Sequence, residues 1–115
     1  MTQINIPIII DADPGVDDFL AIAMAVRSSS LNLLGIATIG GNSPLENTTP
    51  NTLKALHALD ANEIDVAEGV DAALTRPFQF APEFHGLSGL SMDLPLPDRL
   101  LTSTDAIGWL ANKLN

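Results

Sequence analysis

Four aspartates crowd one short polar stretch near the start of the chain, between two apolar segments. The stretch "DADPGVDD" carries Asp11, Asp13, Asp17 and Asp18 within eight residues. Carboxylates this close repel one another and raise one another's pKa unless a cation or a helix N-terminus compensates the charge. Because Ca²⁺ and Mg²⁺ prefer carboxylate oxygens, the cluster favours a site for a hard divalent cation. The alternative is that Asp13 is a turn residue, Asp17 a helix cap, and the other two are solvated.

The segments on either side of the aspartates predict a strand and a helix. Residues 4–10 are short, rich in β-branched side chains and apolar on both faces, which is typical of a strand buried in a parallel sheet. After the "DPG" turn, apolar residues at helical spacing predict a helix that begins at Val16 or Asp17. We expect Phe19 and Met24 to contribute to the core.

Strands and helices continue to alternate along the chain. Residues 31–39 predict a second buried strand, and residues 63–69 a short third one. The helix between them has two candidate starts. Either Thr49 is its N-cap and Pro50 its first helical residue, or the helix begins near Leu45 and Pro50 kinks it.

A closing helix, capped by Ser103 or Thr104, follows a long loop at residues 74–101. This order of elements predicts an α/β fold with a Rossmann-like, doubly wound, mainly parallel sheet, and residues 1–115 form a single domain. In such sheets ligands bind beyond the carboxyl ends of the strands. The aspartates and Asn42 both follow predicted strands, so the fold places them at one rim.

The composition narrows the class of protein further. The net charge of −9 argues against nucleic acid as a partner, because binding phosphates requires clustered Lys and Arg. The absence of Cys excludes disulfides and thiolate metal sites. The N-terminus "MTQINIPIII" has no basic region and only a short apolar run, so we expect neither a signal peptide nor a membrane span, and a cytoplasmic location.

Two known acidic patterns fit the aspartates poorly. A calcium-binding EF-hand loop needs an oxygen ligand, a glycine and a glutamate where this chain has Gly15, Val16 and Ile22. The D-x-D pair of the haloacid-dehalogenase-like phosphotransferases matches Asp11 and Asp13, as nucleophile and acid. The proline and glycine that follow depart from that family's pattern, and the later aspartate pair is left without a role. We keep the phosphotransferase as the alternative.

A third pattern matches much better. The stretch "DADPGVDD" resembles the D-x-D-P-G-x-D-D signature of the inosine-uridine-preferring nucleoside hydrolases. In the same order, "IATIGGN" resembles that family's second strand, and "FHGLSG" resembles its H-G-x-x-G segment. The resemblance covers about the first third of a typical member. It implies the N-terminal part of a larger nucleoside hydrolase fold, with the C-terminal remainder absent.

The resemblance also implies a chemistry and roles for the site residues. Family members hydrolyse the N-glycosidic bond of purine or pyrimidine ribonucleosides to ribose and free base, and they hold one Ca²⁺ in the pocket. By motif position, Asp13 and Asp18 are the calcium ligands, with Asp18 bidentate, and Asp13 is also the general base toward a calcium-bound water. Asp17 binds the ribose hydroxyls, and Asn42 positions the water or the ribose.

The remaining expectations concern Asp11, the histidines and the partners. Asp11 is expected to orient the other aspartates without binding the ion, and His85 to contact the leaving base or relay a proton, while His57 is structural. The family's other ligands lie downstream, so we expect residues 1–115 alone to be inactive unless the missing segment is supplied in cis or in trans. The expected partners are a ribonucleoside substrate and either a second copy in a homo-oligomer or a complementing chain. The alternatives are the D-x-D phosphotransferase and a non-catalytic fragment that binds a cation or a partner.

Overall fold

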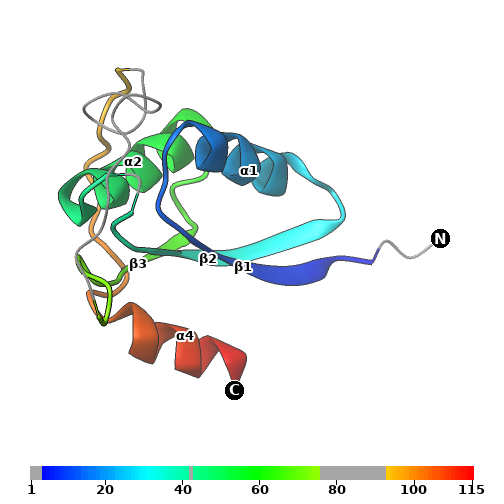
Figure 1. The fold of residues 1–115 in the computed structure, drawn as a ribbon. Coiled ribbons are helices and arrows are strands. Elements are labelled where there is room, and N and C mark those ends of the chain that lie inside the picture. The colour runs from blue at the N-terminus through cyan, green and yellow to red at the C-terminus, as the bar shows by residue number, and fades with distance from the viewer. Residues whose placement is uncertain (1–3, 42, 76–92) are drawn as a thin grey trace.

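The chain folds around a small sheet in which all strands are parallel. The computed structural model describes residues 4–41, 43–75 and 93–115. The three strands lie in the order β1-β2-β3 (Figure 1). In chain order the elements are β1 (Ile6–Ala12), α1 (Val16–Arg27), β2 (Leu31–Thr38), α2 (Leu45–Ala58), β3 (Asp65–Glu68) and α4 (Ala106–Leu114).

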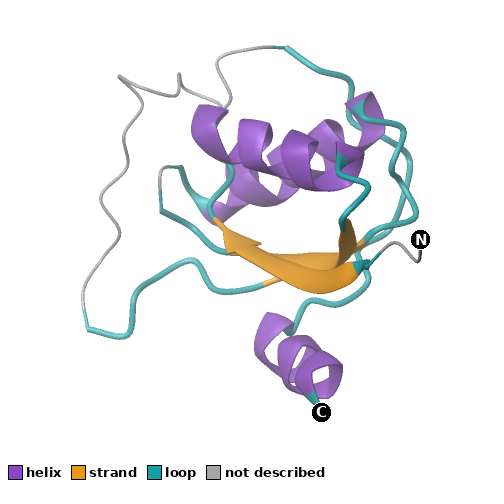
Figure 2. Ribbon diagram, turned by 90° about the vertical axis from the view of Figure 1, so that its right-hand side faces the viewer, coloured by secondary structure: helices purple, strands orange, loops and turns teal. Residues whose placement is uncertain are grey.

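Helices cover both faces of the sheet. The helices α1 and α2 lie side by side on one face, and α4 lies on the other (Figures 1 and 2). Each of the two crossovers β1-α1-β2 and β2-α2-β3 joins parallel neighbours in the same direction across the sheet, and right-handed connections of this kind place both helices on the same face. The predicted α/β fold with a parallel sheet is confirmed.

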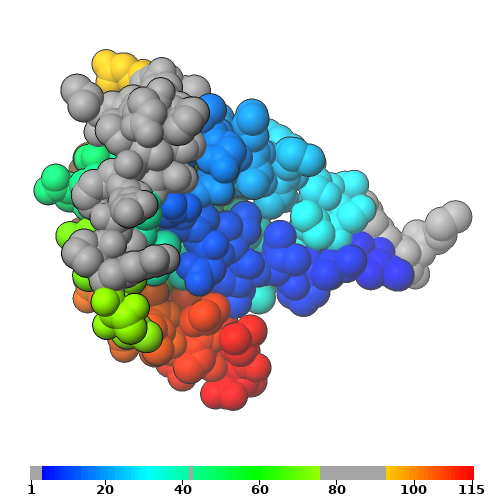
Figure 3. Space-filling view, viewed as in Figure 1, coloured from blue at the N-terminus to red at the C-terminus, as the bar shows by residue number. Residues whose placement is uncertain are grey.

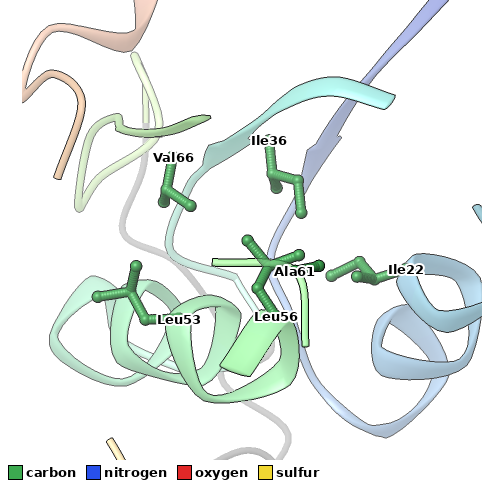
Figure 4. Packing of buried hydrophobic residues seen from close by; sticks show 6 residues of the cluster. All are labelled: Ile22, Ile36, Leu53, Leu56, Ala61 and Val66. Atoms are coloured by element: carbon green, nitrogen blue, oxygen red, sulfur yellow. The ribbon is translucent and has the colours of Figure 1, made fainter. Parts of the chain in front are cut away.

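The main core lies between the sheet and the pair α1 and α2. Ile22 from α1, Leu56 from α2, Ile36 from β2 and Val66 from β3 are fully buried and point toward one another (Figure 4). A smaller cluster on the opposite face is formed where Trp109 of α4 packs against the sheet. The two clusters hold the helices against the two faces of the sheet and so fix the position of the carboxyl ends of its strands.

The buried face of α1 differs from the expected one. Met24 is 73% exposed and Phe19 is half-buried, whereas Ile22 and Ala25 face the core. The prediction of Met24 as a core residue was wrong because α1 is apolar around most of its circumference, so its periodicity does not define a single buried face. Packing against β2 and α2 selects that face instead.

The start of α2 follows the second of the two sequence interpretations. The helix begins at Leu45, directly after Pro44, and Pro50 lies inside it. Thr49 is therefore not the N-cap. Its side chain is buried, and its hydroxyl lies 2.8 Å from the hydroxyl of Thr38 in a hydrogen bond between helix and sheet.

The last helix has a different cap from the two that were expected. Asp105 is the N-cap of α4, and its carboxylate accepts a hydrogen bond from the backbone N–H of Gly108 at 3.1 Å. Ser103 instead accepts from the backbone N–H of Asp105 at 3.0 Å and so shapes the turn before the helix. An aspartate at the last non-helical position is the better acceptor, because its charge also interacts favourably with the helix dipole.

The outer edges of β1 and β3 differ in whether another segment forms hydrogen bonds with them. Beside β3, the backbone N–H of Glu68 donates to the carbonyl of Ser103, and the N–H of Thr102 donates to the carbonyl of Val66. Within the described ranges, β1 pairs only with β2, and in Figure 3 its atoms lie uncovered between α1 and α4. Ile6 at its start is 52% exposed. None of the helices in the described part of the chain is long and apolar enough to cross a membrane.

Candidate functional site

Three of the four aspartates meet at the carboxyl end of β1. Asp13 follows the strand, and Asp17 and Asp18 lie in the first turn of α1. The buried Pro14 and Gly15 make the connection between them. We refer to residues 13–18 as the acidic turn, because it holds three carboxyl groups within one sharp reversal of the chain.

Asp13 and Asp18 are in direct contact. When it is protonated, the carboxyl group of Asp18 hydrogen-bonds to the carboxyl group of Asp13, and it also accepts a hydrogen bond from the backbone N–H of Asp13. Burial, then the hydrogen bond to the Asp13 side chain and the charges of Asp17 and Asp13, raise the pKa of Asp18 from 3.8 to about 6. The turn therefore holds negative charge that its own surroundings do not fully stabilise.

Asp11 is not part of this contact. It pairs with Ala37 across the sheet and shares a face of β1 with Ile9, which packs on the α4 side. There it borders a hollow of about 150 Å³ between the sheet and α4, whose lining includes Val70 and Leu110. Within the described residues, no hydrogen bond or ion pair joins Asp11 to the other three aspartates, and its expected role in orienting them stays a prediction.

The loop after β2 lies against the acidic turn. A side chain at Gly41 would collide with the carboxyl group of Asp13, so the absence of a Cβ is what lets the loop pass. The backbone N–H of Gly41 donates to the carbonyl of Ser43 at 2.9 Å, which closes the loop before α2. Asn42 and His85, the other two expected site residues, lie outside the described residues.

Two polar side chains that were not predicted as site residues form hydrogen bonds at the carboxyl-terminal rim of the sheet. Asn51 of α2 is buried, and its amide donates to the carbonyl of Pro14 at 3.3 Å. Asp71, in the loop after β3, accepts from the backbone N–H of Leu45 at 2.9 Å and so caps α2, whose N-cap position is occupied by a proline. A signal for Asn51 was present, because asparagine inside an otherwise amphipathic helix is unfavourable unless its amide has a partner.

The donor set of the acidic turn fits a hard divalent cation. One carboxylate oxygen of Asp18, Oδ2, is buried and has no hydrogen-bond partner among the described residues. An unpartnered buried carboxylate oxygen beside a second carboxylate is a ligand pair for an ion that takes oxygen donors. In the described part of the chain, no group of three or more His, Asp or Glu side chains forms a complete metal site. The turn therefore offers two ligands, and water or further oxygens would have to supply the rest.

The acidic turn places three carboxyl groups at the carboxyl end of β1, which is the rim at which parallel α/β sheets bind ligands. The sequence model of the inosine-uridine preferring nucleoside hydrolases matches residues 8–115. The chain belongs to this family. Between the two interpretations of the D-x-D pair, the match favours the nucleoside hydrolase over the phosphotransferase.

Individual relatives agree with the family assignment. The chain is 42% identical over 86 residues to the non-specific ribonucleoside hydrolase RihC of Klebsiella pneumoniae, covering 75% of this chain and 28% of the relative. It is 43% identical over 98 residues to the uridine nucleosidase of Saccharomyces cerevisiae, covering 84% of this chain and 29% of the relative. The chain thus spans less than a third of the length of these relatives.

The fold is also that of solved nucleoside hydrolases. A purine-preferring ribonucleoside hydrolase from Gardnerella vaginalis superimposes with a TM-score of 0.88 at 29% identity, over 94% of this chain and 36% of the other. A plant nucleoside hydrolase superimposes with a TM-score of 0.86 at 36% identity, over 95% of this chain and 35% of the other. The expectation that the chain matches one part of a larger nucleoside hydrolase fold is confirmed.

Proposed function

We propose that the acidic turn is the ion-binding and ribose-binding part of a ribonucleoside hydrolase, an enzyme that cleaves the N-glycosidic bond to release ribose and a free base. The direct contact between Asp13 and Asp18 carries the proposal, because it brings two carboxylates together at the ligand-binding rim and leaves one buried oxygen unpartnered. Membership of the nucleoside hydrolase family supports the same chemistry.

Each aspartate of the turn has a role that its position suits. Asp13 and Asp18 hold the ion, which we propose to be Ca²⁺ because only oxygen donors are offered. When bound, such an ion lowers the pKa of a water molecule that it ligates. Asp13, at the mouth of the turn, accepts the proton of the attacking water as general base. Asp17 is exposed and free to extend toward the ribose hydroxyls.

The same carboxylates serve the bond cleavage. Departure of the base leaves positive charge on the sugar ring, and negative side chains beside the ring stabilise that charge. A ribose held by hydrogen bonds to its hydroxyls is oriented for attack by water. We further propose that Asn42 positions the water or the ribose and that His85 contacts the leaving base, as the motif positions suggest. The cytoplasmic location also stays a prediction.

The proposal is tested by supplying the remainder of the fold. Residues 1–115 replace the matching segment of the yeast uridine nucleosidase, and the release of uracil from uridine is followed with Ca²⁺ or with a chelator. We expect calcium-dependent turnover by the chimera and negligible turnover by the 115-residue chain alone. Substitution of the general base, Asp13→Asn, is expected to lower kcat by about 10²–10⁴-fold. Asp17→Asn is expected to raise KM as well as lower kcat.

Asp60→Asn is the matched control for these substitutions. Asp60 is exposed and follows the end of α2, at the end of the sheet opposite the acidic turn, and its positive φ of 57° is one that asparagine also adopts. This variant should keep the kinetics of the unsubstituted chimera. Full turnover by the Asp13→Asn chimera, or turnover that is unaffected by the chelator, would contradict the proposed roles.

A further inference from the structure

Asn51 occupies an unusual place for an asparagine. It lies in the middle of α2 and is only 1% exposed. Asparagine is mostly a surface residue, and it is disfavoured inside helices because its side chain competes for backbone hydrogen bonds. Here the side-chain amide instead donates to the carbonyl of Pro14 at 3.3 Å, across 37 positions of sequence.

The hydrogen bond from Asn51 ends at the carbonyl of Pro14, inside the acidic turn. Pro14 connects Asp13 to the start of α1, and it has no backbone N–H with which to hold the turn. The N-cap of α1, Gly15, has no side chain to cap the helix. At the start of α1, the N–H of Phe19 donates to the carbonyl of Gly15. The carbonyl of Pro14, one residue earlier, accepts a hydrogen bond from the side chain of Asn51 in α2. The amide of Asn51 thus ties the turn to the core from outside the turn itself.

We propose that Asn51 is a positioning residue of the acidic turn. By fixing the Pro14 carbonyl, it sets the approach of the Asp13 carboxyl group, on one side of the proline, to that of Asp18 in the first turn of α1. Its bond goes to the backbone of the turn, so its effect on an ion or a substrate is transmitted through these two aspartates. The inference rests on the function proposed for the acidic turn, and it adds a second element, α2, to the machinery of the site.

A neighbouring residue on α2 provides a matched control. Thr52 is fully buried next to Asn51 in sequence, and its hydroxyl donates to the carbonyl of Thr48 at 2.9 Å, within the same helix. Replacing it with valine removes a buried hydrogen bond of α2 without changing any bond to the acidic turn. Thr52→Val therefore reports the general cost of altering the polar interior of the helix.

The experiment measures local opening of the turn by amide hydrogen exchange in the 115-residue chain. The N–H of Phe19 reports the first turn of α1, and the N–H of Ile36, in the central strand, reports the whole core. Asn51→Leu keeps the branched, four-atom shape of the side chain but has no hydrogen-bond donor. We expect exchange at Phe19 to accelerate on the order of tenfold more than exchange at Ile36, which is the effect of one buried hydrogen bond. Thr52→Val should change both amides equally.

A second variant and a second measurement keep the inference open to refutation. Asn51→Ser restores a shorter donor and should give an intermediate ratio of the two exchange rates. Calorimetric titration with Ca²⁺ should show weaker binding by Asn51→Leu than by Thr52→Val. An unchanged exchange ratio in Asn51→Leu would overturn the positioning role, whatever the calcium result. If the original chain binds no Ca²⁺ but the ratio changes, the positioning role stands and the proposed ion site fails.

Discussion

Replacing Asp18 by asparagine should stabilise the protein, and only above a defined pH. The pKa of Asp18 is raised from 3.8 to about 6 by burial, by its hydrogen bond to Asp13 and by the neighbouring charges. Between these two pH values the folded chain binds more protons than the unfolded chain, so its free energy of unfolding falls as pH rises through this window and stays lowered above it. Asp18→Asn has no carboxyl group to ionise at this position, so its free energy of unfolding should not fall in this pH range for that reason.

The size of the effect follows from the same numbers. A rise in pKa from 3.8 to about 6 corresponds to about 3 kcal/mol at 1.36 kcal/mol per pKa unit. Asp18 is only partly buried, so solvent screens much of this energy, and the N-terminus of α1 favours the charged form. We therefore expect Asp18→Asn to be more stable than the original chain by about 1–2 kcal/mol at pH 7.5, and by a negligible amount at pH 3.5.

Urea unfolding at the two pH values measures this difference, and Trp109, the only tryptophan, provides the fluorescence signal. Asp17→Asn is the matched control, because it removes one charge from the same helical turn at an exposed position. Its gain at pH 7.5 should be smaller than that of Asp18→Asn. The reasoning would be refuted if Asp18→Asn raised the free energy of unfolding equally at both pH values, or lowered it at pH 7.5. Either result would mean that the ionised Asp18 does not destabilise the folded chain.

Three further substitutions test the rim and the α4 face. Gly41→Ala places a methyl group against the carboxyl group of Asp13 and should weaken Ca²⁺ binding measured by calorimetry; binding unchanged from that of the original chain would contradict the close approach. Asp71→Ala removes the cap of α2 and should lower the free energy of unfolding by about 0.5–2 kcal/mol in urea, whereas no loss would mean that solvent satisfies the helix end equally well. Gly35→Ala places a methyl group against the ring of Trp109 and should lower the free energy of unfolding by about 1–3 kcal/mol, with a shift in tryptophan fluorescence. Unchanged stability and an unchanged spectrum would show that α4 can move away from the sheet at no cost in free energy.

Within the described ranges, the sequence was sufficient for the order of elements and for most of the acidic turn. Strands with apolar side chains on both faces and the turn residues between them predicted the parallel sheet. The tight turn after Asp13 predicted that all four aspartates meet at its rim, which holds for Asp13, Asp17 and Asp18 but not for Asp11. These features depend on local chain geometry, which periodicity and turn chemistry report directly. The family signature suggested roles that the spacing alone left open, and these roles stay predictions.

Tertiary packing decided what the sequence could not. The apolar surface of α1 extends almost all round, so only its neighbours determine that Ile22 is buried and Met24 exposed. The contacts of Asn51 and Asp71 with the rim join residues that are far apart in the chain, and no local pattern reports such pairs. Alternation along β1 places Asp11 on the α4 face with Ile9, and Asp13 does not follow it there because the strand ends at Ala12.

The cap that Asp71 places on α2 has a consequence for the order of folding. The bond spans 26 positions of sequence, so the first turn of α2 gains its cap only after β3 has docked beside β2. Contacts between distant residues carry the larger cost of loop closure and tend to form late. The unit β1-α1-β2, which includes the acidic turn, can assemble through short connections before that step. Loss of the cap would then act mainly on the unfolding rate, leaving the refolding rate nearly unchanged, and the first turn of α2 would open before the unit β1-α1-β2.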